Sequence, residues 1–393
     1  MHVVVVGGGI GALTAARFLS NEKKDDLRVT LISPRDYVEY IPSALQCMVD
    51  PWHVDKSTAV LEDVVRRCKG RLEFVQDQVI GIDDGKVSLR SNRDIAYDCL
   101  LIASGTTYDS PIHAGGKTVD ERKAELEEFK VRLDKSEHVM IAGGGITGVE
   151  LAAEIRQTYK DKEVTLVARS TGLILDCGAK ASGYVEKWFR KHRVRVITNA
   201  KAMPASDGTV QLWSADSGED TEKLKVDLFI PCFGGKPNSQ FMDERYLDRR
   251  GRIVVGTDLR VEGMGGSVFA IGDIASISGG HALFAEKTAE VASRNILNLN
   301  QNKPMLKYPI SAYKVPYELT ATAVSLGKWD GIVIMGPLPI SGLLAAGIKH
   351  FIEWAFVQFL SVKRLGFIYG IVLGVTLPTV RLLDKLTGNA PST

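Results

Sequence analysis

Two short glycine-rich turns are the part of this sequence with the clearest chemical use. The first reads Gly7-Gly8-Gly9-Ile10-Gly11-Ala12 and the second reads Gly143-Gly144-Gly145-Ile146-Thr147-Gly148. Small residues at the first and third positions let the backbone turn tightly and approach a pyrophosphate, whose charge then lies at the N-terminus of the following helix. The two turns therefore predict that two dinucleotides bind to the same chain.

Each turn has the flanking elements that such a site needs. Apolar, β-branched runs precede the turns, an amphipathic helix follows each turn, and a second apolar strand comes about 20 residues later. The four expected strands are residues 3–6, 29–32, 139–142 and 164–167. One glycine pattern would be weak evidence because short patterns occur by chance, but two complete units support each other. The alternative is two such units that bind no ligand.

Length and pattern together predict a multidomain α/β protein. The 393 residues exceed one ordinary core, and helix-period segments alternate with strand-period segments. An apolar strand near 99–102 precedes the second glycine unit and another near 268–271 follows it, so we expect the second unit to be inserted in the first. The fold expected is two Rossmann-like dinucleotide-binding domains with a partly apolar C-terminal region. The boundaries expected are 1–108 with 240–320 for the first domain, 109–239 for the second, and 321–393 for the C-terminal region.

Charge and cysteine content exclude several other classes of protein. The formal net charge is +2, with basic and acidic residues interspersed, which gives no reason to expect a nucleic-acid partner. The five cysteines are scattered and form no C-x-x-C pair, so we expect no metal site, no local redox disulfide and a reducing compartment. Because the first strand begins at His2, we expect no cleavable targeting segment.

Further motifs add a family resemblance. Ala103-Ser104-Gly105, the turn 234–238 and Gly272-Asp273 follow the glycine turns in an order that resembles the two-domain flavoproteins of the pyridine nucleotide-disulfide oxidoreductase superfamily. The sequence is most similar to the ferroptosis-suppressor and apoptosis-inducing-factor-like branch and to the type II NADH:quinone dehydrogenases. The resemblance extends to about Trp329, and it implies FAD as the cofactor and NADH or NADPH as the co-substrate.

This resemblance assigns the first glycine turn to the FAD pyrophosphate. It places the Asp273 carboxylate on the ribityl hydroxyls, and it places the N-terminus of the helix that carries Glu286 at the flavin, where a positive dipole end stabilises the reduced ring. Glu286 replaces the family's Gln, and Ser33 replaces the acid that binds the adenosine ribose. The residues expected to contact FAD are Gly7, Gly9, Gly11, Ala12, Ser33, Arg35, Val79, Ala103, Ser104, Gly105, Gly272, Asp273 and Glu286.

The second glycine turn is assigned in the same way to the nicotinamide dinucleotide. Glu150 matches the acid expected near the nicotinamide and the flavin edge, and we expect it to be the catalytic residue; otherwise it is an acid favoured by the helix dipole. The second strand ends at Ala168 instead of an acid, and Arg169 offers a fork that suits a 2′-phosphate, so we expect NADPH to be accepted alongside NADH. The residues expected to contact this nucleotide are Gly143, Gly145, Ile146, Gly148, Arg169 and Gly234.

The absence of a cysteine pair limits which electron acceptor we expect. Without a redox disulfide, a hydride that reaches the flavin must leave directly to a diffusible molecule, so we expect an FAD-dependent NAD(P)H:quinone oxidoreductase. One alternative is a redox-sensing flavoprotein that acts through partner binding. Another is a sulfide:quinone reductase, for which only Cys47 and Cys177 are candidates. The aromatic segment 37–40 is expected at the flavin's other face.

The C-terminal region points to a lipid-soluble acceptor. Residues 340–360 are mostly apolar, with a narrow polar stripe of His350, Glu353 and Ser361, which is typical of a helix lying in a membrane interface. Lys363 and Arg364 could then meet anionic lipid headgroups.

The last apolar segment, residues 365–380, is uncharged and shorter than the ~20 residues that a spanning helix needs. Gly366, Gly370 and Gly374 form a small-residue face suited to close helix packing. We therefore expect a peripheral, monotopic protein on the cytoplasmic side of a membrane. The alternatives are a buried helix pair, a homodimer interface and a single tilted span.

Overall fold

The first of two parallel sheets carries the first glycine turn. The computed structural model describes residues 1–22, 26–68, 71–277, 279–308, 322–334 and 339–361. The sheet has the order β19-β9-β1-β2-β5, and every neighbouring pair is parallel. Its strands are β1 (His2–Val6), β2 (Arg28–Ser33), β5 (Leu72–Gln76), β9 (Cys99–Ile102) and β19 (Val268–Ala270). Most residues of these strands are apolar and buried, because other elements cover both faces of the sheet.

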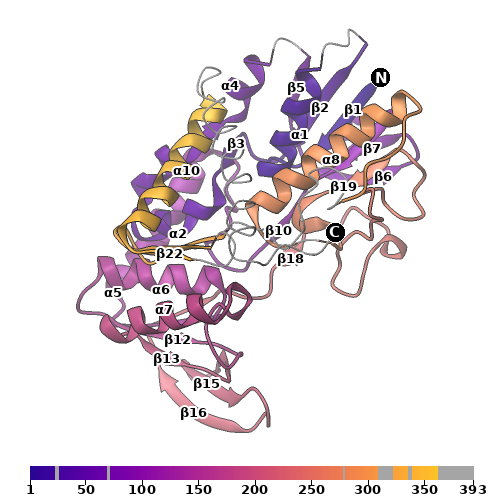
Figure 1. Cartoon of the computed structure of the whole chain (residues 1–393). Helices are drawn as coiled ribbons and strands as arrows, with labels where there is room; N and C mark the ends of the chain where they lie inside the picture. The colour runs from indigo at the N-terminus through magenta and orange to yellow at the C-terminus, as the bar shows by residue number, and fades with distance from the viewer. Residues whose placement is uncertain (23–25, 69–70, 278, 309–321, 335–338, 362–393) are drawn as a thin grey trace, which may run out of the picture.

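Alternate residues of these strands enter two different cores. Val3 and Val5 pack under α1 (Ile10–Ser20) and α8 (Ala282–Asn300), which lie side by side (Figure 1). Val4 and Val6 pack against an antiparallel sheet on the other face. That sheet consists of β6 (Val79–Asp83), β7 (Lys86–Leu89) and β8 (Asp94–Ala96). The adjacent strands β5 and β6 therefore belong to two different sheets.

The second parallel sheet repeats this plan with the order β13-β12-β11-β17. Its strands are β11 (His138–Ala142), β12 (Glu163–Val167), β13 (Arg195–Ile197) and β17 (Leu228–Pro231). The helices of this unit are α5 (Val119–Lys135), α6 (Ile146–Thr158) and α7 (Ala179–Lys191). The antiparallel strands β14 (Ala200–Pro204), β15 (Thr209–Ser214) and β16 (Asp220–Lys225) cover its other face.

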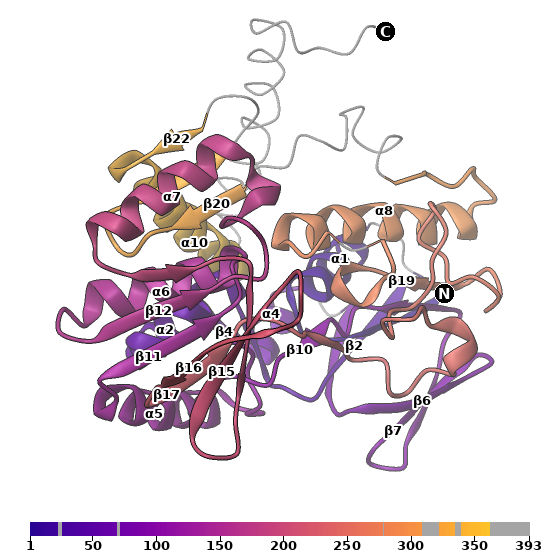
Figure 2. The ribbon, with the colours of Figure 1, turned by 90° about the horizontal axis from the view of Figure 1, so that it is seen from below.

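The second sheet lies between β9 and β19 in the chain, although these strands are neighbours in the first sheet. The two units consequently form two lobes joined by two crossings (Figure 2). The expected α/β fold with two Rossmann-like units is confirmed. The polar stretch expected as a link is largely helix α5, which begins at a Thr118–Glu121 capping box.

A long excursion separates β2 from β5 and reaches into the other lobe. It contains β3 (Tyr37–Glu39), α2 (Ala44–Val49), α3 (Val54–Ser57), β4 (Thr58–Val60) and α4 (Leu61–Arg66), with short 3-10 turns at Ile41–Ser43 and Pro51–His53. Leu45, Met48 and Val54 share one core with Leu126 and Phe129 of α5. Part of the first unit is thus built into the second.

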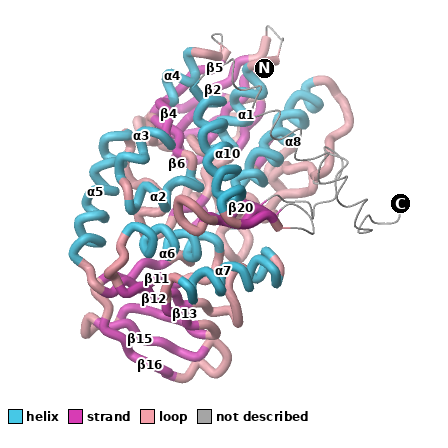
Figure 3. Tube along the Cα trace, turned by 60° about the vertical axis from the view of Figure 1, so that its left-hand side comes forward, coloured by secondary structure: helices cyan, strands magenta, loops and turns pink. Residues whose placement is uncertain are grey.

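The C-terminal region adds a small antiparallel sheet and a long helix. The sheet consists of β20 (Thr322–Ser325), β21 (Gly331–Ile334) and β22 (Ile340–Ser341), and the helix is α10 (Leu343–Ser361). Figure 3 shows α10 running past α2 and α6 toward α3 and β4, across the junction of the lobes. The helix predicted in 340–360 is confirmed, with a start three residues later.

The structure adds which face of that helix meets the protein. Glu353 is only 6% exposed and faces the protein, whereas Leu343, Leu344, Phe351 and Trp354 are exposed. Periodicity shows which residues share a helical face, but it cannot show which face meets the protein. The expected contacts of Lys363 and Arg364 and the glycine face in 365–380 lie outside the described residues.

Candidate functional site

The first glycine turn leaves the N-terminus of α1 open. Gly7 has φ of 126°, and a Cβ there would overlap the Ala103 carbonyl oxygen. Gly9 is the N-cap, no described side chain caps the helix, and a Cβ on Gly9 would meet nothing within 4 Å. Unpaired N–H groups and the helix dipole therefore face open space, which fits an anionic pyrophosphate.

The second glycine turn likewise leaves the N-terminus of its helix open. Gly143 has φ of 136°, and Gly145 is the N-cap of α6 with nothing within 4 Å of an added Cβ. The first turn of α6, which begins at Ile146, contains no acidic residue and receives no side-chain cap from the described chain. Gly148 packs directly on the turn, because a Cβ there would overlap the Gly143 carbonyl oxygen. Both cradles fit the pyrophosphates that the sequence predicts.

The two crossings between the lobes are hydrogen-bonded to each other. Ser104 Oγ donates to the Asn238 carbonyl at 2.8 Å, and Asn238 Nδ2 donates to the Ser104 carbonyl at 2.8 Å. The short strands β10 (Thr106–Thr107) and β18 (Lys236–Pro237) pair beside them. Gly105 and Gly234 have positive φ. The segments 103–105 and 234–238 are thus one structural unit that fixes how the lobes face each other.

Other residues expected around FAD surround the first turn. Gly272 and Asp273 lie in a 3-10 turn, and the Gly272 N–H donates to Thr288 Oγ1 of α8 at 3.3 Å. Glu286 is buried in the first turns of α8. Burial and nearby Asp273 raise the pKa of Tyr108, which places that ring beside the expected ribityl site.

Residues expected at the adenosine end of FAD make contacts within the protein. Ser33 is fully buried at the end of β2, and its Oγ accepts a hydrogen bond from the Arg35 N–H at 3.1 Å. Arg35 is half-buried and lies over the Tyr37 ring, while Val79 begins β6 on the far side of the sheet. Ser33 therefore shapes its own loop and has its hydroxyl already engaged.

Glu150 has partners that its sequence position did not reveal. Its Oε1 accepts a hydrogen bond from the Ser325 N–H at 2.7 Å and lies 3.5 Å from Lys349 Nζ. Both side chains are largely buried. Lys349 is the one lysine in 340–360, and a basic residue in that apolar stretch was a signal for a functional contact.

Tyr40 is the buried aromatic residue of the segment 37–40 that contacts α10. Burial raises its pKa, and the charges of Glu286, Glu353 and Glu150 add to that effect. Its ring packs on Phe356 of α10, with centroids 4.7 Å apart. This contact joins the segment 37–40 to the helix that carries Lys349.

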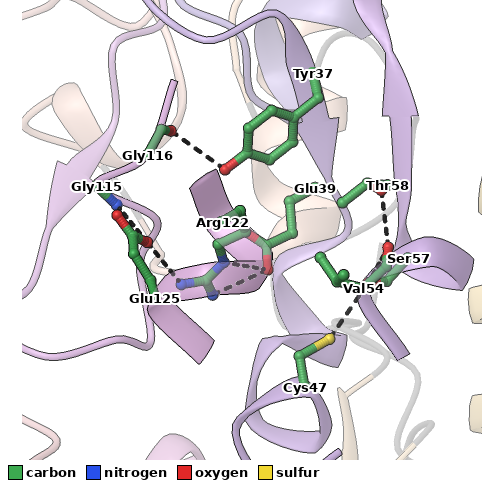
Figure 4. Close-up of polar contacts among 10 residues, drawn as sticks. All are labelled: Tyr37, Glu39, Cys47, Val54, Ser57, Thr58, Gly115, Gly116, Arg122 and Glu125. Carbon is green, nitrogen blue, oxygen red and sulfur yellow. Dashed lines mark hydrogen bonds and ion pairs between the residues drawn. The ribbon is translucent and has the colours of Figure 1, made fainter. Parts of the chain in front are cut away.

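Tyr37 and Glu39 of the same segment make structural contacts. Figure 4 shows Glu39 accepting hydrogen bonds from Arg122 of α5 at 3.1 and 3.3 Å, and both side chains are 0% exposed. The Tyr37 hydroxyl donates to the Gly116 carbonyl. These contacts join β3 to the segment that enters the second lobe.

The cysteines have the properties of buried structural residues. Cys47 is fully buried beside Ser57, and burial raises the pKa of its thiol to about 12 (Figure 4). Burial also raises the pKa of Cys177. No described residues form a cluster able to hold a metal ion. Ala168 is buried under the glycine turn, and Arg169 is exposed after β12.

Comparison with known proteins agrees with this geometry. A family profile described as pyridine nucleotide-disulphide oxidoreductase matches residues 1–302. Oxidoreductase ptaL of Pestalotiopsis fici is 30% identical, over 88% of this chain and 95% of its own length. Ferroptosis suppressor protein 1 of Xenopus tropicalis is 27% identical, over 84% of this chain and 88% of its own length. The chain belongs to the pyridine nucleotide-disulphide oxidoreductase family, whose members use FAD and NAD(P)H.

Solved structures share the fold. The sulfide:quinone oxidoreductase of Aquifex aeolicus superposes with a TM-score of 0.76 at 18% identity, covering 92% of this chain and 91% of that one. NDH2 of Plasmodium falciparum in complex with NADH gives 0.73 at 16% identity, covering 94% of this chain and 96% of that one.

Proposed function

We propose that this protein is an FAD-dependent NAD(P)H:quinone oxidoreductase that works without a redox disulfide. The buried Glu150–Lys349 pair carries the proposal, because Glu150 lies in α6 two residues after Gly148, which packs on the glycine turn of the nucleotide cradle. A buried ion pair costs desolvation, so its position beside the expected nicotinamide favours a functional role. The names of the solved relatives, which include a quinone and NADH, support the same reaction class.

Each nucleotide has a set of residues that would hold it. We assign residues 1–108 with 240–320 to FAD and residues 109–239 to NAD(P)H. The Gly7–Gly9 turn and the N-terminus of α1 would hold one pyrophosphate, and Asp273 would accept hydrogen bonds from ribityl hydroxyls. FAD supplies a two-electron carrier between the nucleotide and the acceptor. Glu150, fixed by Ser325 and Lys349, would orient the nicotinamide side of the site.

The open end of β12 supports use of NADPH. A carboxylate at position 168 would repel a 2′-phosphate, and Ala168 leaves no such charge. Arg169 is exposed beside it and can reach a phosphate from solvent.

The buried cysteines argue against the sulfide alternative. A thiol must ionise to act as a nucleophile, and burial raises the pKa of Cys47 to about 12. The redox-sensing alternative would show slow turnover with every acceptor, and the same assay tests both.

We also propose that α10 rests on a membrane surface through its exposed apolar face. Leu343, Leu344, Phe351 and Trp354 form that face, and Trp329 is exposed in the adjoining loop. Among the described residues, no helix is both long and apolar enough to cross a bilayer. An amphipathic helix of this kind binds in the plane of the interface.

The main experiment measures oxidation of NADH and NADPH with short- and long-tail quinones, ferricyanide and sulfide. Purified protein should be yellow, release FAD on denaturation and reduce quinones in many turnovers. Asp273→Ala should weaken FAD retention by roughly 1.5–3 kcal/mol, because a charged acceptor is lost. A colourless protein that FAD cannot reconstitute, or turnover with sulfide alone, would contradict the proposal.

Vesicle binding tests the membrane surface. Phe351→Ser with Trp354→Ser should abolish co-sedimentation with phosphatidylcholine–phosphatidylserine vesicles and leave ferricyanide reduction intact. Val131→Ser, which removes an exposed apolar residue of α5, is the matched control. If the double variant instead converts a dimer to a monomer and vesicles never bind, this face is a homodimer interface.

A further inference from the structure

The inner side of α10 carries charged residues beyond the Lys349–Glu150 pair. His53 Nε2 lies 2.5 Å from Glu353 Oε1, and His350 Nδ1 lies 3.8 Å from Glu353 Oε2. Glu154 of α6 lies within electrostatic reach of both Lys349 and His350. We name this set the α10 acid–base cluster; its members are His53, Glu154, Lys349, His350 and Glu353.

Glu154 is placed to hold a proton. It lies one helical turn from Glu150, is 7% exposed, and its Oε1 is 3.4 Å from Ser325 Oγ. Burial raises the pKa of Glu154, and the like charge of Glu150 adds to the shift. Glu150 and Glu154 are two buried carboxylates, and the Lys349 ammonium is 3.5 Å from Glu150, so a proton on Glu154 reduces the repulsion between the two acids.

His350 is placed to take a proton from solvent. Its side chain is 40% exposed, and its Nε2 lies 3.2 Å from the Lys328 carbonyl. The nearby Glu353 carboxylate raises the pKa of His350. Burial alone would raise the pKa of Glu353, but His350 and the hydrogen-bonded His53 outweigh burial and lower the pKa of that carboxylate.

We propose that His350 and Glu154 supply the proton that quinone reduction consumes, while Glu353 and His53 position His350. The inference rests on the proposed function, because NAD(P)H, quinone and one proton give NAD(P)⁺ and hydroquinone. One hydrogen reaches the quinone as the hydride of NAD(P)H, and the other must come from solvent as a proton. Glu154 and Glu150 meet at Ser325, which donates its hydroxyl to Glu154 at 3.4 Å and its N–H to Glu150 at 2.7 Å. The proposed route therefore starts at the exposed His350, continues to Glu154 and ends at the Glu150–Lys349 pair. The titratable groups facing it are Tyr40, His53, Glu150, Lys349 and Glu353.

Comparing two electron acceptors, quinone and ferricyanide, distinguishes proton delivery from a structural role. Ferricyanide consumes no proton, because NAD(P)H and two ferricyanides give NAD(P)⁺, one proton and two ferrocyanides. In the FAD-loaded enzyme, Glu154→Gln and His350→Gln should each lower quinone-dependent kcat about tenfold or more and change ferricyanide-dependent kcat less than about twofold. The wild-type solvent isotope effect with quinone should change in both variants.

The control is His138→Gln, which removes a histidine 3.9 Å from Glu163 at the edge of the second sheet. It should leave both acceptor activities unchanged. Equal losses with quinone and ferricyanide in the cluster variants would show a structural role, and no loss would show that protons arrive elsewhere. Either result overturns the proposal. A wild-type enzyme that reduces ferricyanide and no quinone would instead overturn the proposed function.

Proton binding can also be measured without turnover. NMR titration of the seven histidines, in FAD-free and FAD-loaded protein, should show one whose pKa lies above its ordinary value and whose signal disappears in His350→Gln. Glu353→Gln should lower that pKa by about one unit, because the ionised partner is lost. An unchanged titration in Glu353→Gln would overturn the positioning role.

Discussion

In the first glycine turn the sixth residue is Ala12, and in the second it is Gly148. Ala12 is fully buried without conflict, whereas a Cβ on Gly148 would overlap the Gly143 carbonyl oxygen. Helix α6 therefore sits closer to its turn than α1 does. The two turns therefore differ in backbone geometry at the sixth position of the motif. The residue type at that position depends on the distance between the helix and the turn, and not only on the ligand.

The two units differ further after their second strands. In the first unit, β2 leads into the excursion, and Glu39 of the excursion forms a buried ion pair with Arg122 of α5. In the second unit, β12 ends at buried Ala168 and leads directly to exposed Arg169. The chain that follows β2 is thus tied to the other lobe, whereas the chain that follows β12 is exposed. We expect this difference to suit a retained cofactor in the first unit and an exchangeable co-substrate in the second.

Breaking the Glu39–Arg122 pair should give the largest effect. Arg122→Met leaves the Glu39 carboxylate buried without its cation, which should lower the free energy of unfolding by roughly 3–5 kcal/mol. Denaturant unfolding measures the change. Asp94→Asn, which breaks the exposed Lys86–Asp94 pair, is the control and should lower the free energy of unfolding far less, because water screens the two charges. Equal costs would mean that the buried pair does not hold the excursion.

Gly148→Ala should have the next largest effect. The added Cβ overlaps backbone that cannot move cheaply, so unfolding free energy should fall by about 3 kcal/mol and NAD(P)H binding should be lost. Gly145→Ala should bind NAD(P)H weakly yet retain stability, because its Cβ enters open space. Gly11→Ala, whose Cβ would lie 3.4 Å from Ala285, should be tolerated in the first unit. A stable Gly148→Ala that binds nucleotide would remove the proposed difference between the helices.

Acid should destabilise the packing of the segment between β10 and α5, which contains His113. Burial, with Arg35 and Arg122 adding to it, lowers the pKa of His113 to about 4. The unfolded chain binds this proton below pH ~6.5 and the folded chain only near pH 4, so stability falls as the pH drops through that window. The loss should be roughly 2–3 kcal/mol by pH 4. His113→Gln should flatten the slope between these pH values, and an unchanged slope would assign it to other groups.

Arg169→Ala should produce the smallest effect. Loss of the guanidinium should lower kcat/KM for NADPH about tenfold, equivalent to about 1.4 kcal/mol, and leave NADH nearly unchanged. Arg190→Ala, at an exposed position of α7, is the control in the same lobe. If NADPH and NADH fall together, Arg169 does not read the 2′-phosphate.

Local pattern alone determined the repeated glycine turns, their flanking strands and helices, the insertion of one unit in the other and the family. These features follow from short-range rules, because a tight turn before a helix needs particular small residues and a buried parallel strand needs an apolar run. The cradle glycines, the hinge and Gly272-Asp273 could therefore be named from the sequence. Their contacts with nucleotides remain predictions.

Only the tertiary structure decided which charged residues meet. Glu39 and Arg122 are 83 residues apart, Glu150 and Lys349 are 199 apart, and His53 and Glu353 are 300 apart. No local rule couples such positions, and each side chain alone suggests a solvated surface. The orientation of α10 was undetermined for the same reason: its polar residues suit water or a buried ion pair equally well. In the structure Glu353 and Lys349 meet His53 and Glu150, while Leu343, Leu344, Phe351 and Trp354 are exposed.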